Sequence, residues 1–204
     1  MAKKVITGPG LSTEEKIIEA ARKVFTQKGY SATRTRDIAE EAGLNLALLN
    51  YYFRSKEKLF EIVMMEKMLK FFGVMAPVLN DAATTLENKV KVIAEKYTEL
   101  LLENPDLPLF ILSEIRNSPR QFLSIVQKAN FLNGSVFIKQ IQMKRPDLNP
   151  LQFLVSLLGM CVFPYVMKPV LQMMSSVSEK EFTRMMKERK TLIPAWTKAI
   201  LKAK

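Results

Sequence analysis

Apolar residues recur along the first part of the chain at intervals of three and four, the spacing that places side chains on one face of an α-helix. The first such run covers 13–28. Ser12 and Glu15 stand before it with the spacing of a capping box, and Gly29 follows it, where glycine commonly ends a helix. The pattern therefore predicts one amphipathic helix at the start of the chain.

Two much shorter helical segments come next. The first, 35–42, ends at Gly43, and the second, 46–53, begins after Asn45, a residue type that caps helix N-termini well. Ser55 then stands where it can cap a longer helix. Two short helices joined by a tight turn are the pattern of a helix-turn-helix, which presents its second helix to the major groove of DNA.

The rest of the chain also has helical periodicity, with capping residues and prolines at the boundaries. About nine helices are expected in all, so the predicted fold class is all-α. Pro164, Pro169 and Pro194 are expected to kink or break the helices in which they occur. The helices expected after Ser55 cover 56–77, 85–103 (or a start at Asp81), 107–117, 119–145, a segment from 150 and a last segment from 179.

Composition excludes much enzyme chemistry. The 204 residues are 48% hydrophobic and 25% charged, as in an ordinary globular protein. There is no His and the only Cys is Cys161, which removes Ser-His and Cys-His pairs and any His/Cys zinc site. We therefore expect no enzyme, no metal and no cofactor. A lone Cys forms no intrachain disulfide, and the N-terminus lacks the apolar core of a signal peptide, so a cytoplasmic protein is expected.

The formal net charge is +11, from 31 basic and 20 acidic residues, and this favours an anionic partner such as nucleic acid. The charge is not concentrated in the helix-turn-helix segment. Residues 1–60 hold 11 basic and 7 acidic side chains, whereas 180–204 holds 8 and 2. The simplest interpretation of the basic C-terminal segment is a solvated helix face.

Helical geometry indicates which side chains of the second short helix face outward. Leu49 and Phe53 are four residues apart and share the inner face, which leaves Ala47, Asn50 and Tyr51 toward the opposite side. An asparagine side chain can bond adenine, and a small apolar one can contact a thymine methyl group. From periodicity alone, the alternative is that the two segments are merely short core helices.

The segment GYSATRTRDIAEEAGLNLALLNYYFRSKEKLF, residues 29–60, closely resembles the DNA-binding domain of the TetR family of bacterial transcription regulators. The resemblance includes the turn at Gly43 and covers about residues 11–62. Leu46, Leu48 and Asn50 differ from residues common in the family, so the operator is not inferred from relatives. The resemblance implies contacts with double-stranded DNA from Thr35, Arg36, Asn45, Leu46, Ala47, Asn50, Tyr51, Tyr52 and Lys56.

The resemblance also implies a division of the chain into three parts. Residues 1–10 are expected to form a flexible tail, 11–58 the helix-turn-helix DNA-binding domain with its recognition helix at about 46–52, and 59–204 a domain for ligand binding and dimerisation.

Residues 151–167 are apolar and uncharged throughout, so this helix is expected either in a deeply buried position or in a membrane. The resemblance implies that the last two helices pair with their copies in a homodimer, which would bind a pseudo-palindromic operator. The alternative is a membrane-associated helical protein that uses 151–174 and the basic C-terminal helix. The residues expected at the dimer interface are Leu154, Leu158, Cys161 and Trp196.

Methionine and aromatic side chains are frequent in the C-terminal part, where such residues usually form ordinary core. The resemblance implies that some of them line a pocket for a small-molecule effector, which we expect to be largely apolar and to release a repressor from its operator. Arg116 is a candidate counter-charge for an acidic ligand, or else a solvated surface residue. The residues expected at this pocket are Met64, Met68, Phe71, Met75, Tyr97, Phe110, Arg116 and Phe122.

Overall fold

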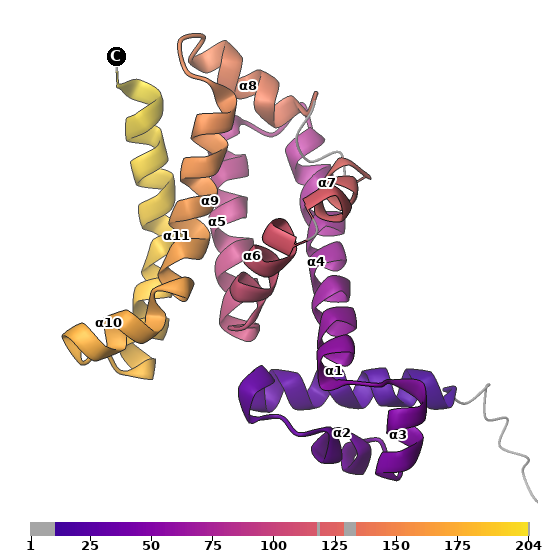
Figure 1. Cartoon of the computed structure of the whole chain (residues 1–204). Helices are drawn as coiled ribbons and strands as arrows, with labels where there is room; N and C mark the ends of the chain where they lie inside the picture. The colour runs from indigo at the N-terminus through magenta and orange to yellow at the C-terminus, as the bar shows by residue number, and fades with distance from the viewer. Residues whose placement is uncertain (1–10, 118, 129–133, 204) are drawn as a thin grey trace, which may run out of the picture. The chain divides into compact units, whose positions relative to one another are not determined.

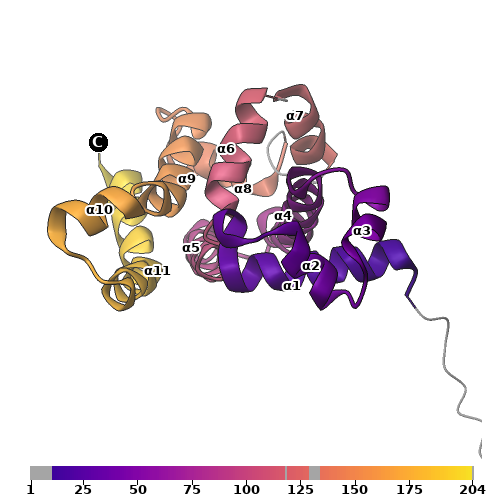
Figure 2. The same cartoon turned by 60° about the horizontal axis from the view of Figure 1, so that its bottom comes forward.

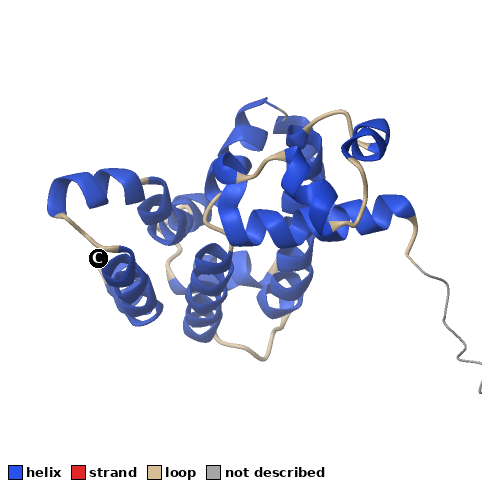
Figure 3. Cartoon of the chain, turned by 90° about the horizontal axis from the view of Figure 1, so that it is seen from below, coloured by secondary structure: helices blue, strands red, loops and turns tan. Residues whose placement is uncertain are grey.

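The computed structural model describes residues 11–117, 119–128 and 134–203, and this part of the chain is built from helices and loops without strands (Figures 1 and 3). The all-α prediction is confirmed, with eleven described helices in place of about nine. The helices are α1 (Thr13–Ala32), α2 (Thr35–Glu41), α3 (Leu46–Tyr52), α4 (Lys56–Asn80), α5 (Leu86–Glu103), α6 (Leu107–Asn117), α7 (Pro119–Lys128), α8 (Val136–Lys144), α9 (Pro150–Val166), α10 (Lys168–Ser175) and α11 (Glu179–Lys202). The tail predicted at 1–10 lies outside the described residues.

Two of the expected helices are divided in the structure. The segment expected as one helix over 119–145 contains α7 and α8, because Gly134 has a φ of 78° and Ser135 caps a new helix by accepting a hydrogen bond from the Ile138 N–H. The expected segment from 150 is divided into α9 and α10. Pro169 stands in the first turn of α10, and the axes of the two helices differ by 57°.

Pro194 does not interrupt the last helix, contrary to expectation. α11 continues from Glu179 to Lys202 with the proline inside it. A proline removes one N–H donor from a helix and leaves the residues on both sides free to pack. Here Ile193 and Thr197, on either side of Pro194, are both buried.

The chain divides into two compact units, Met1–Glu66 and Lys67–Lys204, and α4 contributes residues to both. In the first unit, α1 packs against α2 and α2 against α3. The ring of Phe60 contacts the rings of Phe25 and Tyr30, with centroid distances of 5.2 and 4.6 Å. The buried apolar residues of this unit are Ile17, Ala20, Ala21, Val24, Phe25, Ile38, Ala39, Leu49, Phe53, Leu59, Val63 and Met64.

In the second unit, α5 packs along α11, and α9 packs against both of them. Figures 1 and 2 show α9 and α11 side by side, with α10 joining them. One face of α9 is buried through Phe153, Leu157 and Cys161. The long apolar run, expected either in a deeply buried position or in a membrane, is buried on this face only, and Leu151, Val155 and Phe163 of the same helix are exposed.

Within the described residues, no single helix is both long enough and apolar enough to cross a bilayer. α9 and α10 meet such a test only when they are taken together, and they are separated by the 57° bend.

Candidate nucleic-acid interface

The turn between α2 and α3 is fixed by Gly43, whose φ of 67° is in the left-handed region. The Gly43 N–H donates to the Glu40 carbonyl at 3.0 Å, and the Leu44 N–H donates to the Ala39 carbonyl at 2.9 Å. A Cβ atom at position 43 would meet nothing within 4 Å, so the backbone conformation, and not space, is what favours glycine. The Asn45 Oδ1 atom then accepts from the Leu48 N–H at 2.7 Å and starts α3.

α3 has a buried side and an exposed side, as its helical spacing predicts. Leu49 is fully buried and Phe53, just after the helix, is 5% exposed. On the other side, Ala47 and Asn50 are exposed and Tyr51 is 80% exposed. The structure thus presents a short outward row of one methyl, one amide and one phenol, held by two apolar anchors.

The other predicted contact residues of α3 lie beside this row. Tyr52 is 42% exposed, and its ring meets the ring of Tyr51 edge-on at 5.3 Å. Leu46 is half-buried. Asn45 is exposed, but its side-chain oxygen is already used in the cap, which leaves its NH₂ group for other partners.

The start of α2 offers N–H groups and cationic side chains. Thr35 is half-buried and Arg36 is exposed. The Asp37 carboxylate accepts from the Arg34 N–H at 2.9 Å, and this hydrogen bond, together with Lys28 at 3.2 Å, lowers the pKa of Asp37 below its usual range. The cap of α2 is therefore anionic, and the cations next to it are exposed.

Lys56 was predicted to contact DNA, and the structure gives its ammonium group several partners within the unit. Its Nζ donates to the carbonyls of Tyr30 at 3.0 Å and Thr33 at 3.1 Å, and it lies 4.1 Å from the Tyr30 ring centroid. Tyr30 in turn donates from its hydroxyl to Glu57 at 2.8 Å. Burial and Glu57 raise the pKa of Tyr30 to about 12. Lys56 thus joins the end of α1 to the start of α4.

Ion pairs separate the cations of this unit into two groups. Those on α1 and α4 mostly face carboxylates, whereas Arg34, Arg36 and Arg54 are exposed and make no ion pair among the described residues. Arg34 and Arg54 flank the helix-turn-helix, and sequence analysis did not single them out. Their position directly before α2 and directly after α3 is the signal that points to them. The paired cations are Arg22, Lys23, Lys28 and Lys58.

The residues predicted to line an effector pocket are mostly buried. Phe71 and Tyr97 are brought together, with ring centroids 4.5 Å apart and nearly perpendicular rings. Phe122 is half-buried and Arg116 is exposed. The buried members are Met64 in the first unit and Met68, Phe71, Met75, Tyr97 and Phe110 in the second.

The four residues predicted at a dimer interface lie on different sides of their helices. Leu154 and Cys161 are 7% and 5% exposed, so their side chains pack inside one protomer. Leu158 is half-buried and Trp196 is 40% exposed. The large apolar side chains that are exposed on α9 and α11 are Leu151, Val155, Phe163, Leu192 and Trp196.

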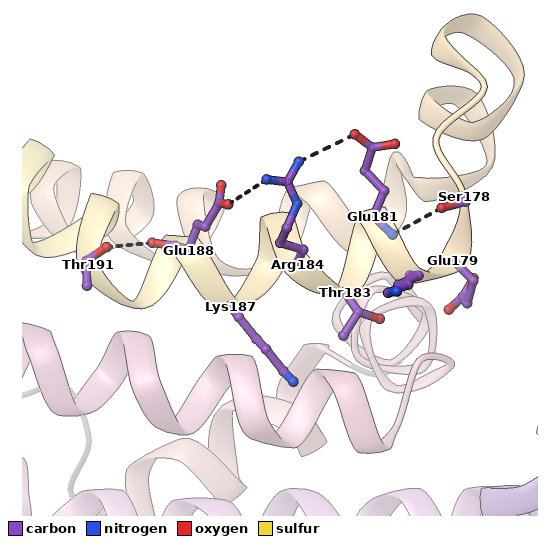
Figure 4. Close-up of a pocket in the computed structure, with 9 residues that line it drawn as sticks. Ser178, Glu179, Glu181, Thr183, Arg184, Lys187, Glu188 and Thr191 are labelled. Atoms are coloured by element: carbon purple, nitrogen blue, oxygen red, sulfur yellow. Dashed lines mark hydrogen bonds and ion pairs between the residues drawn. The ribbon is translucent and has the colours of Figure 1, made fainter.

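A groove runs along the first half of α11, and the residues that line it are of polar and charged types (Figure 4). Arg184 lies between Glu181 at 3.5 Å and Glu188 at 3.4 Å, while Lys187 points away from this row. Every lining residue comes from α11 or its N-cap, Ser178, and most of these residues are charged. The described residues also hold no group of three Cys, Asp or Glu side chains that could bind a metal ion.

Comparison with known proteins agrees with this geometry. Residues 17–63 match the model of bacterial regulatory proteins of the tetR family. The chain is similar to the probable transcriptional regulator YttP of Bacillus subtilis, with 38% identity over 79 residues, which cover 39% of this chain and 36% of YttP. It is also similar to the transcriptional repressor KstR2 of Mycolicibacterium smegmatis, with 27% identity over 68% of this chain and 70% of that protein.

Among solved structures, the chain resembles the transcriptional regulator FadR of Bacillus subtilis, crystallised in complex with stearoyl-CoA. The TM-score is 0.57 and the sequence identity is 20%, over 88% of this chain and 97% of that one. This likeness extends the shared fold beyond the helix-turn-helix to both units. The matched segment 17–63, the turn at Gly43 and the exposed row on α3 together show that the chain contains the DNA-binding domain of the bacterial regulatory proteins of the tetR family.

Proposed function

We propose that the protein is a DNA-binding transcriptional repressor that acts in the cytoplasm as a homodimer and is released from its operator by a small, largely apolar effector. The observation that carries the DNA-binding part is the exposed row of Ala47, Asn50 and Tyr51 on α3, above buried Leu49 and Phe53. α3 has seven residues, about 10 Å of helix, which suits a major groove about 12 Å wide.

The chemistry of this row assigns a role to each side chain. The Asn50 amide can donate to and accept from the edge of adenine, and the Ala47 methyl group can contact the methyl group of thymine. Tyr51 can donate its hydroxyl to a phosphate or a base edge. Phosphates on either side would be bound by the exposed Arg36 and by Thr35 at the start of α2.

Dimerisation is supported by exposed apolar side chains on the last helices. On α9, Leu151 and Val155 are 56% and 66% exposed and lie one turn apart, and Phe163 is 59% exposed two turns further on. Leu192 and Trp196 are one turn apart on α11, which packs beside α9. A second copy of the chain is the occupant that fits a self-complementary face of this kind.

The effector is proposed to bind in the second unit. Its buried methionine and aromatic side chains favour an apolar ligand. The similar FadR structure holds stearoyl-CoA, and a fatty acyl compound is consistent with such a lining. A ligand that binds better to the conformer of the dimer with wrongly spaced recognition helices shifts the population toward that conformer, and operator affinity falls as a result. α4 is the covalent connection between the two units along which such a shift can act.

Selection of bound duplexes from a random DNA pool tests this proposal. The purified full chain should enrich an inverted repeat, read by sequencing. Asn50→Ala should weaken binding to the recovered sequence by about 1–3 kcal/mol and relax the base preference at one position of each half-site. Gln27→Ala, a change at an exposed residue of α1, should do neither. The selection is run with and without fatty acyl-CoA. A folded dimer that enriches no sequence in either condition would contradict the proposed function.

A further inference from the structure

α10 is an amphipathic helix whose apolar side faces outward. Val170, Met173 and Met174 are 40%, 85% and 79% exposed, and their three- and four-residue spacing places them on one face of the helix. Lys168 and Gln172, one turn apart, lie on the opposite face. A surface helix of a soluble protein usually has the reverse arrangement, with its apolar side covered and its polar side in water.

The polar side of α10 is bound to its own protomer. Glu179, the first residue of α11, accepts hydrogen bonds from Lys168 at 2.6 Å and from Gln172 at 3.2 Å. The Lys168 ammonium group also lies 5.1 Å from the centroid of the Phe182 ring. These contacts fix the rotation of α10 about its axis, so the opposite face, with the two methionines, is turned away from Glu179.

The position of α10 brings this apolar face close to the surface that we propose for dimerisation. Figures 1 and 2 show α10 projecting past α9 and α11 on the side away from α5. Phe163, which is 59% exposed, is in the last turn of α9, directly before α10. Exposed apolar surface therefore continues along the chain from α9 into α10.

The exposed area also favours a second copy of the chain as the occupant. The five large apolar side chains exposed on α9 and α11 offer on the order of 500 Å², and the three on α10 about 400 Å², at roughly 200 Å² for one complete side chain. Permanent homodimers bury at least about 1,000 Å² from each partner, of which about two thirds is apolar. α9 and α11 alone fall short of this apolar area, whereas the three helices together reach it.

A lipid surface fits α10 less well. Helices that lie on membranes usually carry several Lys or Arg residues on their polar face. α10 has one, Lys168, and its ammonium group is bound to Glu179.

We propose that α10 is a clasp between protomers: its face of Val170, Met173 and Met174 packs on α9 and α11 of a second copy, whose own α10 packs on the first copy in return. This inference rests on the proposed function, because it assigns a further surface to the homodimer. Methionine suits such a contact, since it adapts its shape and its sulfur packs well against aromatic rings. Phe163 and Trp196 are the aromatic side chains exposed on α9 and α11.

The first test compares methionine oxidation within one chain. The full chain is treated briefly with hydrogen peroxide, and methionine sulfoxide is measured at each position by mass spectrometry. Met143 of α8, which is 82% exposed, is the internal control. In the dimer, Met173 and Met174 should oxidise at least about fivefold more slowly than Met143. At a dilution at which sedimentation shows a monomer, the three rates should be similar.

The second test is Met173→Gln combined with Met174→Gln. This double variant should raise the dissociation constant of the dimer at least about tenfold, because four methionine side chains of the dimer lose apolar contacts. Glutamine and methionine have similar helix propensities, so α10 should still form. Met143→Gln is the matched control and should leave the dissociation constant unchanged.

The inference is overturned if Met173 and Met174 oxidise as fast as Met143 in the dimer, or if the double variant keeps the wild-type dissociation constant. Equal protection in the monomer would mean that the chain covers this face itself. Protection that requires vesicles of phosphatidylglycerol would assign the face to a membrane. Either result would also overturn the clasp.

Failure of the proposed function has a different signature. A dimer that protects the two methionines but enriches no operator contradicts the regulator and not the clasp. A dimer that enriches an operator but leaves the two methionines open to oxidation contradicts only the clasp.

Discussion

The guanidinium of Arg189 on α11 donates two hydrogen bonds, of 2.8 and 3.3 Å, to the carbonyl of Met160 on α9. Met160 is four residues before Pro164, which has no N–H to donate to that carbonyl. The arginine therefore supplies, from a neighbouring helix, the hydrogen bonds that the proline removes.

Replacing Arg189 should show how much its hydrogen bonds to the Met160 carbonyl contribute to the free energy of unfolding. Arg189→Met should lower the free energy of unfolding by about 1–3 kcal/mol, because it leaves a carbonyl inside the helix pair without a partner. In a Pro164→Ala background the helix recovers its own N–H donor, so the loss should be smaller. Urea denaturation of the wild type, the two single variants and the double variant, all at the same protein concentration, measures the difference between the two losses of stability. Arg184→Met, at an exposed arginine of the same helix, is the control, and equal losses in both backgrounds would contradict the link.

Lys89 has no exposed surface, and its Nζ donates to the Leu79 carbonyl at the end of α4, at 2.9 Å. Burial lowers its pKa, against a smaller opposing effect of Asp81. The unfolded chain therefore holds this proton to a higher pH than the folded chain does. As a result, the folded state gains stability as pH rises through the interval between the lowered pKa and the ordinary lysine value of about 10.4.

Comparison of the wild type with Lys89→Met isolates this effect. From pH 8 to pH 10, the free energy of unfolding of the wild type should rise relative to that of the variant, measured by chemical denaturation at each pH. Other alkaline titrations are common to both proteins and cancel. A difference that stays constant over this range would show that Lys89 keeps an ordinary pKa in the folded protein.

Lys56 and Arg36 should respond differently to removal of their charge. Lys56→Met loses two hydrogen bonds and a contact with the Tyr30 ring, so the free energy of unfolding should fall by about 1–3 kcal/mol. Arg36→Ala, at an exposed position, should leave the free energy of unfolding within about 0.5 kcal/mol of the wild type. It should reduce the slope of the logarithm of the operator-binding constant against the logarithm of salt concentration by the contribution of about one phosphate contact.

Denaturation and salt titration of DNA binding on both variants check this pair. If Lys56→Met kept full stability and only the salt slope decreased, the lysine would be a phosphate contact and not a link between α1 and α4.

Val155 is 66% exposed on the apolar face of α9 that we propose for dimerisation. Val155→Asp should give a monomer by light scattering and greatly weaken operator binding, because two buried carboxylates would face each other across a two-fold interface. Met143→Asp on α8, at a side chain 82% exposed, is the control and should stay dimeric. If Val155→Asp remained a dimer, this face would not be the interface.

The helix-turn-helix was predictable because its signals are local. Asn45 caps the helix that follows it, Gly43 has the conformation that glycine favours, and Leu49 is buried as its spacing requires. The orientation of Ala47, Asn50 and Tyr51 follows from the same few residues. Burial of Leu49 and of Phe53, just after the helix, fixes which side of α3 faces the core.

Contacts between distant parts of the chain were not predictable in this way. Arg189 and Met160 are 29 residues apart, and nothing in the local pattern links them. The apolar run at 151–167 has hydrophobic residues on all sides, so periodicity does not distinguish the buried Leu154 from the exposed Val155. Lys56 has the local environment of a DNA contact in the sequence, and only the folded unit shows that it also binds the carbonyls of Tyr30 and Thr33.

For the proposed DNA-binding function, the balance of charge in the described part of the helix-turn-helix unit has a consequence for how the operator is found. Residues 11–66 contain nine basic and nine acidic side chains, so this part of the chain has no net charge. Generic attraction to phosphate then depends on a few exposed arginines, and time spent on unrelated sequence should be short. Fewer repressor molecules are then bound at the many competing non-specific sites, so a small number of molecules per cell can still occupy the operator.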